Sequence, residues 1–327
     1  MKRIFAFLLT MVLCMCCLFS FTACEAPKKV DNDAIVNPRT ETIKVGVIDY
    51  APLNYMYKNT YKGFNTELAV MTFNALGYNV EFVLVEPEKD HIPTANDVYT
   101  ALEEGEIDCF WGGISDAILF DEERADFSHP YLENPVCLVK STYAGSVSSL
   151  QDLENQTIAF GKNSAGEVFY KHKLENVISG ISSSSCERGQ KSALHKVKSI
   201  TESVNFAVVD LLMALYQKYN GEYADVILTG IDLEQTNKLR VVFKKETGKN
   251  ELRDNVNAIL ETFAYIKTNG KSILTQLAEK YKFSSFPSNV SDFIITDFSA
   301  GSSGGESGGS ANDGSNTVPV PPPWLVD

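Results

Sequence analysis

Short apolar runs alternate along this chain with segments that place apolar residues at helical spacing. The runs predicted as strands are 43–47, 79–85, 107–111, 136–140, 157–160 and 206–209. The segments predicted as helices are 66–76, 98–104, 165–175, 211–218, 251–268 and 273–281. Such alternation is typical of α/β lobes with mostly parallel sheets, because parallel neighbours need a helical crossover. The Ser-rich stretch 178–186 is predicted as a loop.

The first residues have the layout of a secretory signal. Lys2 and Arg3 precede an apolar run over 4–21, and Ala23 and Cys24 follow. We expect a signal peptide over 1–23, a lipid on Cys24 and a polar tether over 24–41. Phe21 stands where such cleavage sites usually carry Leu or another aliphatic residue. An uncleaved membrane anchor is the alternative, since the run is near the minimum for a span. Either arrangement predicts an extracytoplasmic, membrane-tethered protein.

The length of the chain bears on the number of domains, and its net charge bears on the kind of partner. A chain of 327 residues favours two domains. A net charge of -13 disfavours nucleic acid as a partner, because phosphate binding needs clustered Lys and Arg. The stretch 299–327 is rich in Gly, Ser and Pro and is predicted to be a disordered tail, with a polyproline ligand as the alternative. The Cys residues beyond Cys24 have no metal-site spacing, and we expect no metal or cofactor.

A series of short motifs appears in a fixed order along the chain. Tyr50-Ala51-Pro52 follows the first strand, Gly63-Phe64-Asn65 opens a helix, and Trp111-Gly112-Gly113-Ile114-Ser115 follows a later strand. Phe127-Ser128-His129-Pro130-Tyr131, Gly161–Glu167 and Ala207-Val208-Val209-Asp210 come next. In this order the chain resembles the bacterial extracellular solute-binding proteins of the amino-acid type, from about residue 43 to residue 281.

The resemblance implies a type 2 periplasmic-binding-protein fold. In that fold two α/β lobes are joined by two hinge strands and close on a ligand. We expect the first lobe over 42–139 plus 245–298 and the second over 140–244. The resemblance also implies a monomer that captures a small polar solute, such as an amino acid or a derivative, for an ABC permease. Catalysis is not expected.

Candidate ligand-binding residues follow from the matched motifs. They are Asp49, Tyr50, Tyr55, Gly112, Gly113, Ser115, Arg124, Ser164, Ala165, Gly166 and Asp210. The glycines allow close approach of a ligand to the backbone, or only a tight turn. Backbone N–H groups at Ser164–Gly166 suit a carboxylate, although Ser164 also suits a plain N-cap.

The remaining candidates suit the polar and cationic parts of a ligand. Ser115 matches a family Thr whose hydroxyl meets the ligand. Asp210 matches the acid that takes the ligand ammonium, with a helix N-cap as the alternative role. Tyr50 and Tyr55 suit stacking on the ligand, or packing at the rim. Asp49 and Asp116 suit a cation or are turn residues.

One position departs from the family pattern. The Arg that clamps the α-carboxylate is expected five residues after Ser115, where this chain has Phe120. Two readings stay open. Either the loop is rebuilt and Arg124 reaches the carboxylate, or Arg124 faces solvent and Phe120, Trp111 and acids line the site.

Two further functions remain as alternatives. A sensor would present the solute to a signalling receptor instead of a permease. A dehydratase-like enzyme on the same fold would need an acid or base at the site, and no His lies in a motif with an obvious partner.

Overall fold

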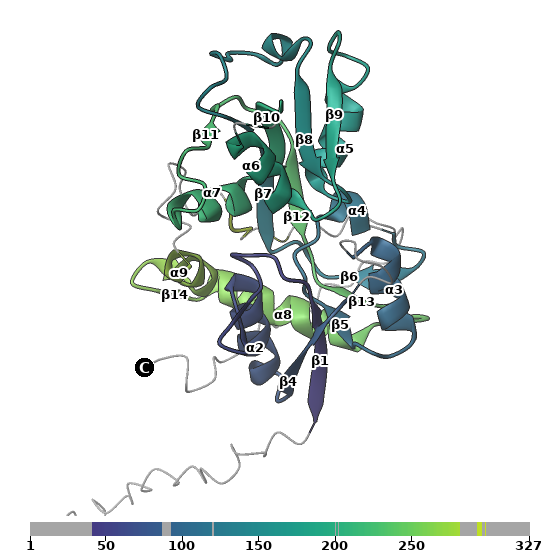
Figure 1. Ribbon diagram of the computed structural model, residues 1–327. Coiled ribbons are helices and arrows are strands. Elements are labelled where there is room, and N and C mark those ends of the chain that lie inside the picture. The colour runs from purple at the N-terminus through teal and green to yellow at the C-terminus, as the bar shows by residue number, and fades with distance from the viewer. Residues whose placement is uncertain are drawn as a thin grey trace, which may run out of the picture. The chain divides into compact units, whose positions relative to one another are not determined.

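The computed structural model describes residues 41–86, 93–119, 121–199, 201, 203–281, 293–295 and 298. The predicted signal peptide, Cys24, the tether, Phe120 and the predicted tail beyond residue 299 lie outside the described residues. The described part contains two large sheets and two two-stranded hairpins (Figure 1). It includes no helix long and apolar enough to cross a membrane.

The first sheet has the strand order β4-β1-β5-β13-β6 among the described residues. Its strands are β1 (Thr42–Val47), β4 (Asn79–Leu84), β5 (Cys109–Phe110), β6 (Ala125–Phe127) and β13 (Val242–Lys244). β1 pairs with β4 and β5 in parallel, whereas β13 runs antiparallel to both β5 and β6. The expectation of mostly parallel sheets is therefore wrong at β13, because this strand returns from the second sheet.

The second sheet has the order β11-β7-β10-β8-β9, with β12 beside β7. Its strands are β7 (Leu132–Lys140), β8 (Thr157–Gly161), β9 (Ser182–Cys186), β10 (Phe206–Asp210), β11 (Ile227–Leu228) and β12 (Thr236–Leu239). β10, β8 and β9 are parallel neighbours, whereas β7 runs antiparallel to β10, β11 and β12, so the expectation of mostly parallel sheets is wrong here too. β9 corrects the loop predicted for 178–186. Its side chains are mostly exposed and polar, so the strand depends on its ladder with β8 and gives no apolar signal.

Two chain crossings join the sheets. The chain passes from β6 to β7 and returns from β12 to β13, and β7 and β12 pair antiparallel with Leu132 opposite Leu239. Two further bonds extend this pairing toward the first sheet: Tyr131 N donates to Leu239 O at 3.1 Å, and Ser128 N donates to Val241 O at 2.9 Å. This arrangement confirms the predicted fold class of α/β sheets joined by crossing strands.

Short hairpins and helices complete the described part. The hairpins are β2 (Tyr55–Tyr57) with β3 (Thr60–Lys62), and β14 (Lys267–Thr268) with β15 (Lys271–Ser272). The helices are α2 (Phe64–Ala75), α3 (Ala95–Glu103), α4 (Asp116–Leu119), α5 (Ala165–Phe169), α6 (Gln190–Lys198), α7 (Leu211–Tyr219), α8 (Glu251–Tyr265) and α9 (Ile273–Lys280). A 3-10 turn spans Leu150–Leu153, and a π-helical turn over Tyr170–Leu174 continues α5.

Side-chain caps start several of these helices. Thr94 and Asp97 form a capping box at α3, and Asn250 and Ser272 accept backbone N–H bonds at α8 and α9. At α2, Asn65 lies inside the helix. Gly63 takes the N-cap position with φ 126°, and Asn65 Oδ1 accepts the hydroxyl of Tyr131 at 3.0 Å.

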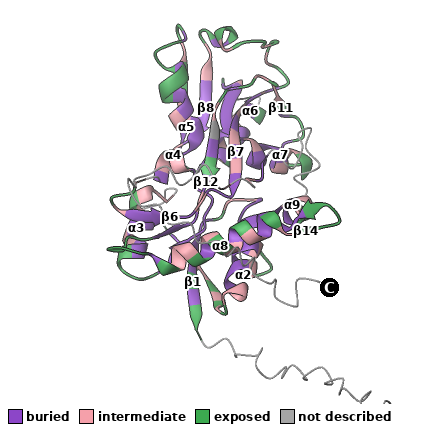
Figure 2. Cartoon of the chain, turned by 180° about the vertical axis from the view of Figure 1, so that it is seen from behind, coloured by how far each residue is buried: buried purple, intermediate pink, exposed green. Residues whose placement is uncertain are grey.

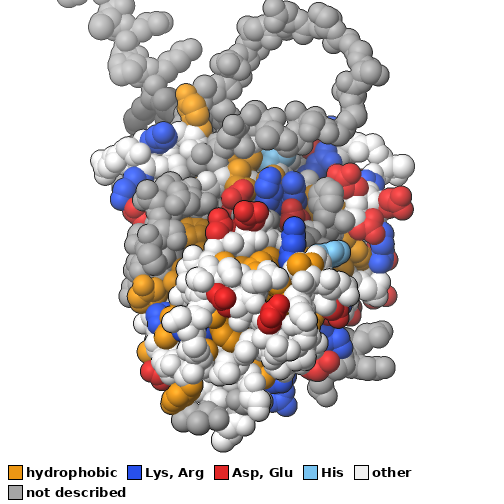
Figure 3. Space-filling view, turned by 90° about the horizontal axis from the view of Figure 1, so that it is seen from above, with side chains coloured by type: hydrophobic (Ala, Val, Ile, Leu, Met, Phe, Trp, Pro, Cys, Tyr) orange, Lys and Arg blue, Asp and Glu red, His pale blue; other side chains and the backbone are white. Residues whose placement is uncertain are grey.

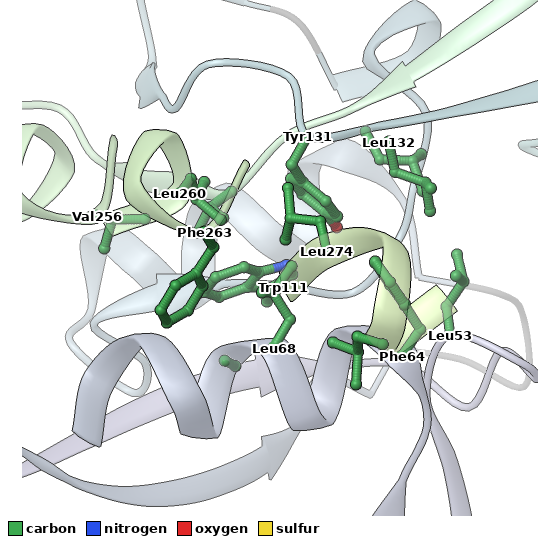
Figure 4. Close-up of a cluster of buried hydrophobic side chains, with 14 of the residues drawn as sticks. Leu53, Phe64, Leu68, Trp111, Tyr131, Leu132, Val256, Leu260, Phe263 and Leu274 are labelled. Atoms are coloured by element: carbon green, nitrogen blue, oxygen red, sulfur yellow. The ribbon is translucent and has the colours of Figure 1, made fainter. Parts of the chain in front are cut away.

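The largest buried cluster packs α2, α8 and α9 against the first sheet. Trp111 and Tyr131 lie at its centre among Phe64, Leu68 and Phe263 (Figure 4). The C-terminal helices thus return to the first sheet, as Figure 1 shows. The second sheet has its own buried clusters on both faces, and buried residues follow its strands in Figure 2. Acidic and basic side chains lie interspersed on the face seen in Figure 3.

A third segment lies beside the crossing strands. Glu133 N donates to Phe293 O at 2.8 Å, and Ile295 N donates to Tyr131 O at 3.3 Å. Phe293 and Ile294 are both buried in the largest cluster. Residues near the C-terminal end of the described part therefore pair with the start of β7.

Candidate ligand-binding site

A cavity of about 950 Å³ lies where strands of both sheets end. We call it the central cavity. From the first sheet it is lined by residues after β1, β4 and β5, among them Asp49, Glu86 and Gly113. From the second sheet it is lined by residues after β8 and β9 and by Asp210 at the end of β10. Carboxyl ends of parallel strands are the usual place for ligands in open α/β sheets, and this volume suits a small molecule.

Asp210 presents a buried carboxylate to the central cavity. The residue is 6% exposed. Its Oδ1 is buried and has no hydrogen-bond partner among the described residues. Burial raises the pKa of Asp210, while hydrogen bonds from Tyr50 and Gln190 oppose that rise. A buried acceptor of this kind needs a donor, and a ligand cation would supply one.

The alternative role of Asp210 as a helix cap is not what the structure shows. Asp210 occupies the N-cap position of α7, but its side chain makes no capping hydrogen bond. Asn134 instead accepts the N–H of Leu212 in the first turn, at 3.2 Å. The carboxylate of Asp210 thus makes no hydrogen bond to the backbone donors of α7.

Tyr50 reaches Asp210 from the first-sheet side. The Tyr50 hydroxyl donates to Asp210 Oδ2 in a short hydrogen bond. Burial raises the pKa of Tyr50 well above its ordinary value, and the charge of Asp210 raises it further. Tyr50 therefore stays protonated as a donor. Its backbone is fixed by a tight turn in which Tyr50 N donates to Asn54 O at 2.7 Å.

Gln190 completes the polar group and was not predicted from the sequence. Its Nε2 donates to Asp210 Oδ2 at 2.9 Å and to the Tyr50 hydroxyl at 3.3 Å. Its Oε1 accepts the backbone N–H of Asp210 at 2.6 Å. The sequence signal that would have found it is Gly189 before an amphipathic segment, which marks the start of α6. Asp210, Tyr50 and Gln190 are called the Asp210 triad below.

The turn before α5 supplies part of the opposite wall. Ser164 and Ala165 line the central cavity, whereas Gly166 is not among the lining residues. Ser164 is an N-cap whose hydroxyl accepts Glu167 N at 3.3 Å and donates to Gly161 O at 2.6 Å. A Cβ on Gly166 would lie 2.3 Å from Val208 O, so this glycine allows α5 to pack on β10.

The turn after β5 brings Gly113 and Ser115 to the central cavity. Gly113 has φ +83°, and a Cβ there would lie 2.9 Å from Leu53. Gly112 is not among the lining residues, and a Cβ on it would meet the ring of Phe110 at 1.9 Å. Packing thus explains Gly112, while Ser115, at 5% exposed, is a buried part of the wall.

Asp49 and Tyr55 also line the central cavity. Tyr55, on β2, faces Tyr216 of α7, with ring centroids 6.0 Å apart. This ring contact joins the first-sheet side to the second at another point from the Asp210 triad. Asp49 is exposed and follows β1 directly.

The structure does not bring Arg124 to the central cavity. Its guanidinium donates to Asn96 and Glu103 at 3.0 Å each and lies 4.6 Å from the ring centre of Tyr99. All three partners belong to α3. Asp116 is likewise absent from the lining and accepts the N–H of Lys238 at 3.2 Å. Trp111, named with Phe120 in the alternative reading, is fully buried in the core.

Arg188 is a basic residue that sequence reasoning missed. It precedes Gly189 and Gln190, is exposed, and lines the central cavity. No described ion pair includes it. Within the described residues, no cluster of His, Cys, Asp or Glu is suited to hold a metal ion.

Paired sheets, two crossing strands and a polar cavity at the strand ends define a bilobed solute-binding protein. The chain belongs to the bacterial extracellular solute-binding proteins, family 3, whose family model matches residues 43–284.

The individual relatives share less than a quarter of their residues with this chain. The chain is 23% identical over 263 residues to the arginine-binding extracellular protein ArtP of Bacillus subtilis (strain 168), covering 77% of this chain and 91% of ArtP. An ancestral arginine-binding protein bound to arginine matches with a TM-score of 0.58 at 23% identity, covering 73% of this chain and 97% of that one. A cysteine-binding protein from Campylobacter jejuni matches with a TM-score of 0.62 at 15% identity, covering 78% and 95%. At these identities the structural matches establish the fold alone.

Proposed function

We propose that this protein is the extracytoplasmic substrate-binding component of an ABC importer and that it binds a small α-amino acid in the central cavity. One observation carries the proposal: the buried Asp210 Oδ1 has no described partner, in a cavity lined from both sheets. A ligand ammonium would donate to this oxygen in a charge-assisted bond. The family, and relatives named for binding arginine and cysteine, support an amino acid over a sugar.

The ligand carboxylate would be held on the second-sheet side. Arg188 lies on the cavity wall, and Ala165, which also lines it, begins α5. Arg is the side chain best suited to bidentate carboxylate binding. In this proposal Arg188 takes the role that Arg124 and Phe120 do not fill.

Closure would occur about the β7–β12 crossing. The lobes expected from the sequence are 42–139 plus 245–298 and 140–244. Since β7 belongs to the second sheet and β13 to the first, we propose that the lobe boundaries lie closer to the start of β7 and the end of β12. The Asp210 triad and the Tyr55–Tyr216 ring contact connect the two sides of the cavity. In this proposal both sets of contacts are made only when the lobes are closed, and they stabilise the closed form relative to the open one.

A thermal-shift screen of the purified full-length chain against single amino acids, polyamines and sugars tests the proposal. A ligand that binds only the folded state stabilises it by about 2.7 kcal/mol at a hundredfold excess over Kd. We expect stabilisation by at least one α-amino acid. No response to any α-amino acid, with a response to a sugar or polyamine, would reject this function.

Binding without turnover is part of the proposal. None of the described histidines lines the central cavity, and His129 is paired with Glu261 at 3.1 Å. Mass spectrometry of the recovered ligand should find it unchanged. Recovery of a dehydrated product would instead indicate a dehydratase-like enzyme.

We propose that the chain is cleaved between Ala23 and Cys24 and is attached to the membrane by a lipid on Cys24. Mass spectrometry of the mature N-terminus tests it: we expect a lipid-modified Cys24 as the first residue. A chain that still begins at Met1 would indicate an uncleaved anchor. Co-purification with a permease in the native membrane would distinguish importer from sensor.

A further inference from the structure

Acidic residues outnumber basic residues in the lining of the central cavity. The acids are Asp49, Glu86, Glu187, Asp210 and Glu222, and the bases are Lys162, Arg188 and Lys191. Two of the bases are already paired: Lys162 with Glu187 and Lys191 with Glu222, each at 2.9 Å. Asp49 and Glu86 belong to no described ion pair.

Asp49 and Glu86 follow the ends of two neighbouring strands of the first sheet. β1 and β4 are parallel neighbours with Val47 opposite Leu84. The pairing continues one step further, because Val85 N donates to Val47 O at 2.9 Å. Asp49 and Glu86 each lie two residues beyond the registered pair, so both leave the sheet at the same edge.

A shared neighbour supports this placement. The pKa of Tyr61 on β3 is raised first by burial and then by the charges of both Asp49 and Glu86. The charges of both carboxylates thus act on the same tyrosine. Two acids outside any described ion pair, at the ends of neighbouring strands, favour an approaching cation.

The Asp210 triad supplies an independent sign that the cavity takes a cationic group. Asp210 is more than nine-tenths buried, and its Oδ1 has no described partner. Asp210 ends a strand of the second sheet, whereas Asp49 and Glu86 follow strands of the first, so the central cavity carries acidic groups on both sides. One positive group on the ligand would satisfy only one of them.

We infer that Asp49 and Glu86 bind a second positive charge, so that the ligand is an α-amino acid with a cationic side chain. The inference rests on the proposed function, in which Asp210 takes the α-ammonium. Arg188 would take the carboxylate, and the side chain would extend toward the β1–β4 edge.

Lys191 is the basic group that faces this edge. Its pKa is raised first by its hydrogen bond to Glu222, and also by the charge of Asp49. Because its ammonium is already bound to Glu222 at 2.9 Å, it leaves Asp49 and Glu86 with net negative charge.

Calorimetric titration of the full-length chain with matched ligands tests the inference. L-arginine and L-citrulline have similar shape, but citrulline lacks the charge, and L-lysine and L-norleucine form a second such pair. We expect the cationic member of at least one pair to bind at least about tenfold more tightly. The double variant Asp49→Asn, Glu86→Gln should bring that ratio toward one. The control Glu81→Gln, an exposed acid on β4 outside the lining, should leave the ratio unchanged.

The outcomes separate this inference from the proposed function. Binding of neutral or acidic amino acids without preference for the cationic partner overturns the inference and leaves the proposed function intact. A preference for arginine or lysine that survives in the double variant also overturns it. Failure of every α-amino acid to bind rejects the proposed function itself.

Discussion

The hydroxyl of Tyr50 donates a hydrogen bond to the carboxylate of Asp210, 160 residues further along the chain. Tyr50 follows a strand of the first sheet, and Asp210 ends a strand of the second. The bond therefore joins the two sides of the central cavity, at the carboxylate proposed to take the ligand ammonium.

Replacing Tyr50 by Phe should weaken ligand binding while keeping the fold. The variant removes one donor to a buried carboxylate, and such bonds contribute about 1.5–3 kcal/mol, or roughly ten- to hundredfold in affinity. Calorimetry with the best ligand from the screen measures the change. Tyr131→Phe is the matched control, because it removes a buried hydroxyl bonded to Asn65 in the core. Equal loss of affinity in both variants would mean that Tyr50 acts only through stability.

Ligand affinity should fall on acidification, beginning above the ordinary pKa of an Asp side chain. Burial raises the pKa of Asp210 from the reference value of 3.8. As the pH falls through this raised pKa, the free protein takes up a proton and the partner of the ammonium is lost. Tyr50 and Cys137, which face Asp210, stay neutral because burial raises the pKa of each.

Titration calorimetry at several pH values, in buffers of different ionisation enthalpy, measures this effect. Binding should release protons in the acidic range where affinity falls. An affinity that stays constant until the pH is well below 3.8 would contradict the raised pKa of Asp210.

Asp126 should stabilise the fold at neutral pH and lose that effect in acid. Its carboxylate accepts bonds from Asn250 Nδ2 at 2.9 Å and Lys245 Nζ at 3.0 Å, which tie β6 to the start of α8. Burial alone would raise the pKa of Asp126, but the bonds from Asn250 and Lys245 lower it overall. Because the folded pKa is below the unfolded one, the stabilisation is present above about 3.8 and is lost as the pH falls through the folded value.

The variant Asp126→Asn should therefore unfold more easily, by about 1–3 kcal/mol at pH 7, with a smaller difference below pH 4. Urea unfolding at both pH values measures the two differences. Glu154→Gln, an exposed acid, serves as the control for charge alone. A difference that is equal at both pH values would show that packing, rather than charge, is involved.

The apolar patterns predicted the fold well because each parallel strand of the first sheet and each core helix buries a regular set of side chains. Val256, Leu260 and Phe263 show this on α8, where all three are buried at helical spacing. β9 and the crossing strand β12 have no such pattern. Their pairing partners β8 and β7 are distant in sequence, so only the assembled sheet defines them.

The site was partly predictable for a similar reason. Asp210 ends a fully buried strand, and Tyr50 lies in a recognisable turn, so local sequence marked both. Gln190 follows the strand that the sequence did not reveal, and Glu86 gains meaning only from its register with Asp49. Counting along the loop gave Phe120 for the expected Arg, with Arg124 as one of two alternatives. Counting could not reveal that the carboxylate of Glu103 and the ring of Tyr99 on α3 hold Arg124.

Calorimetric titration of Asp210→Asn with the best ligand of the unmodified chain tests directly whether the Asp210 carboxylate binds the ligand ammonium. Asn keeps the shape of the side chain but removes the charge that the ammonium needs. The account predicts a folded variant, shown by its circular dichroism, whose affinity is lower by about 2–5 kcal/mol, or at least roughly thirtyfold. A folded variant that binds with nearly unchanged affinity would show that Asp210 does not bind the ligand ammonium.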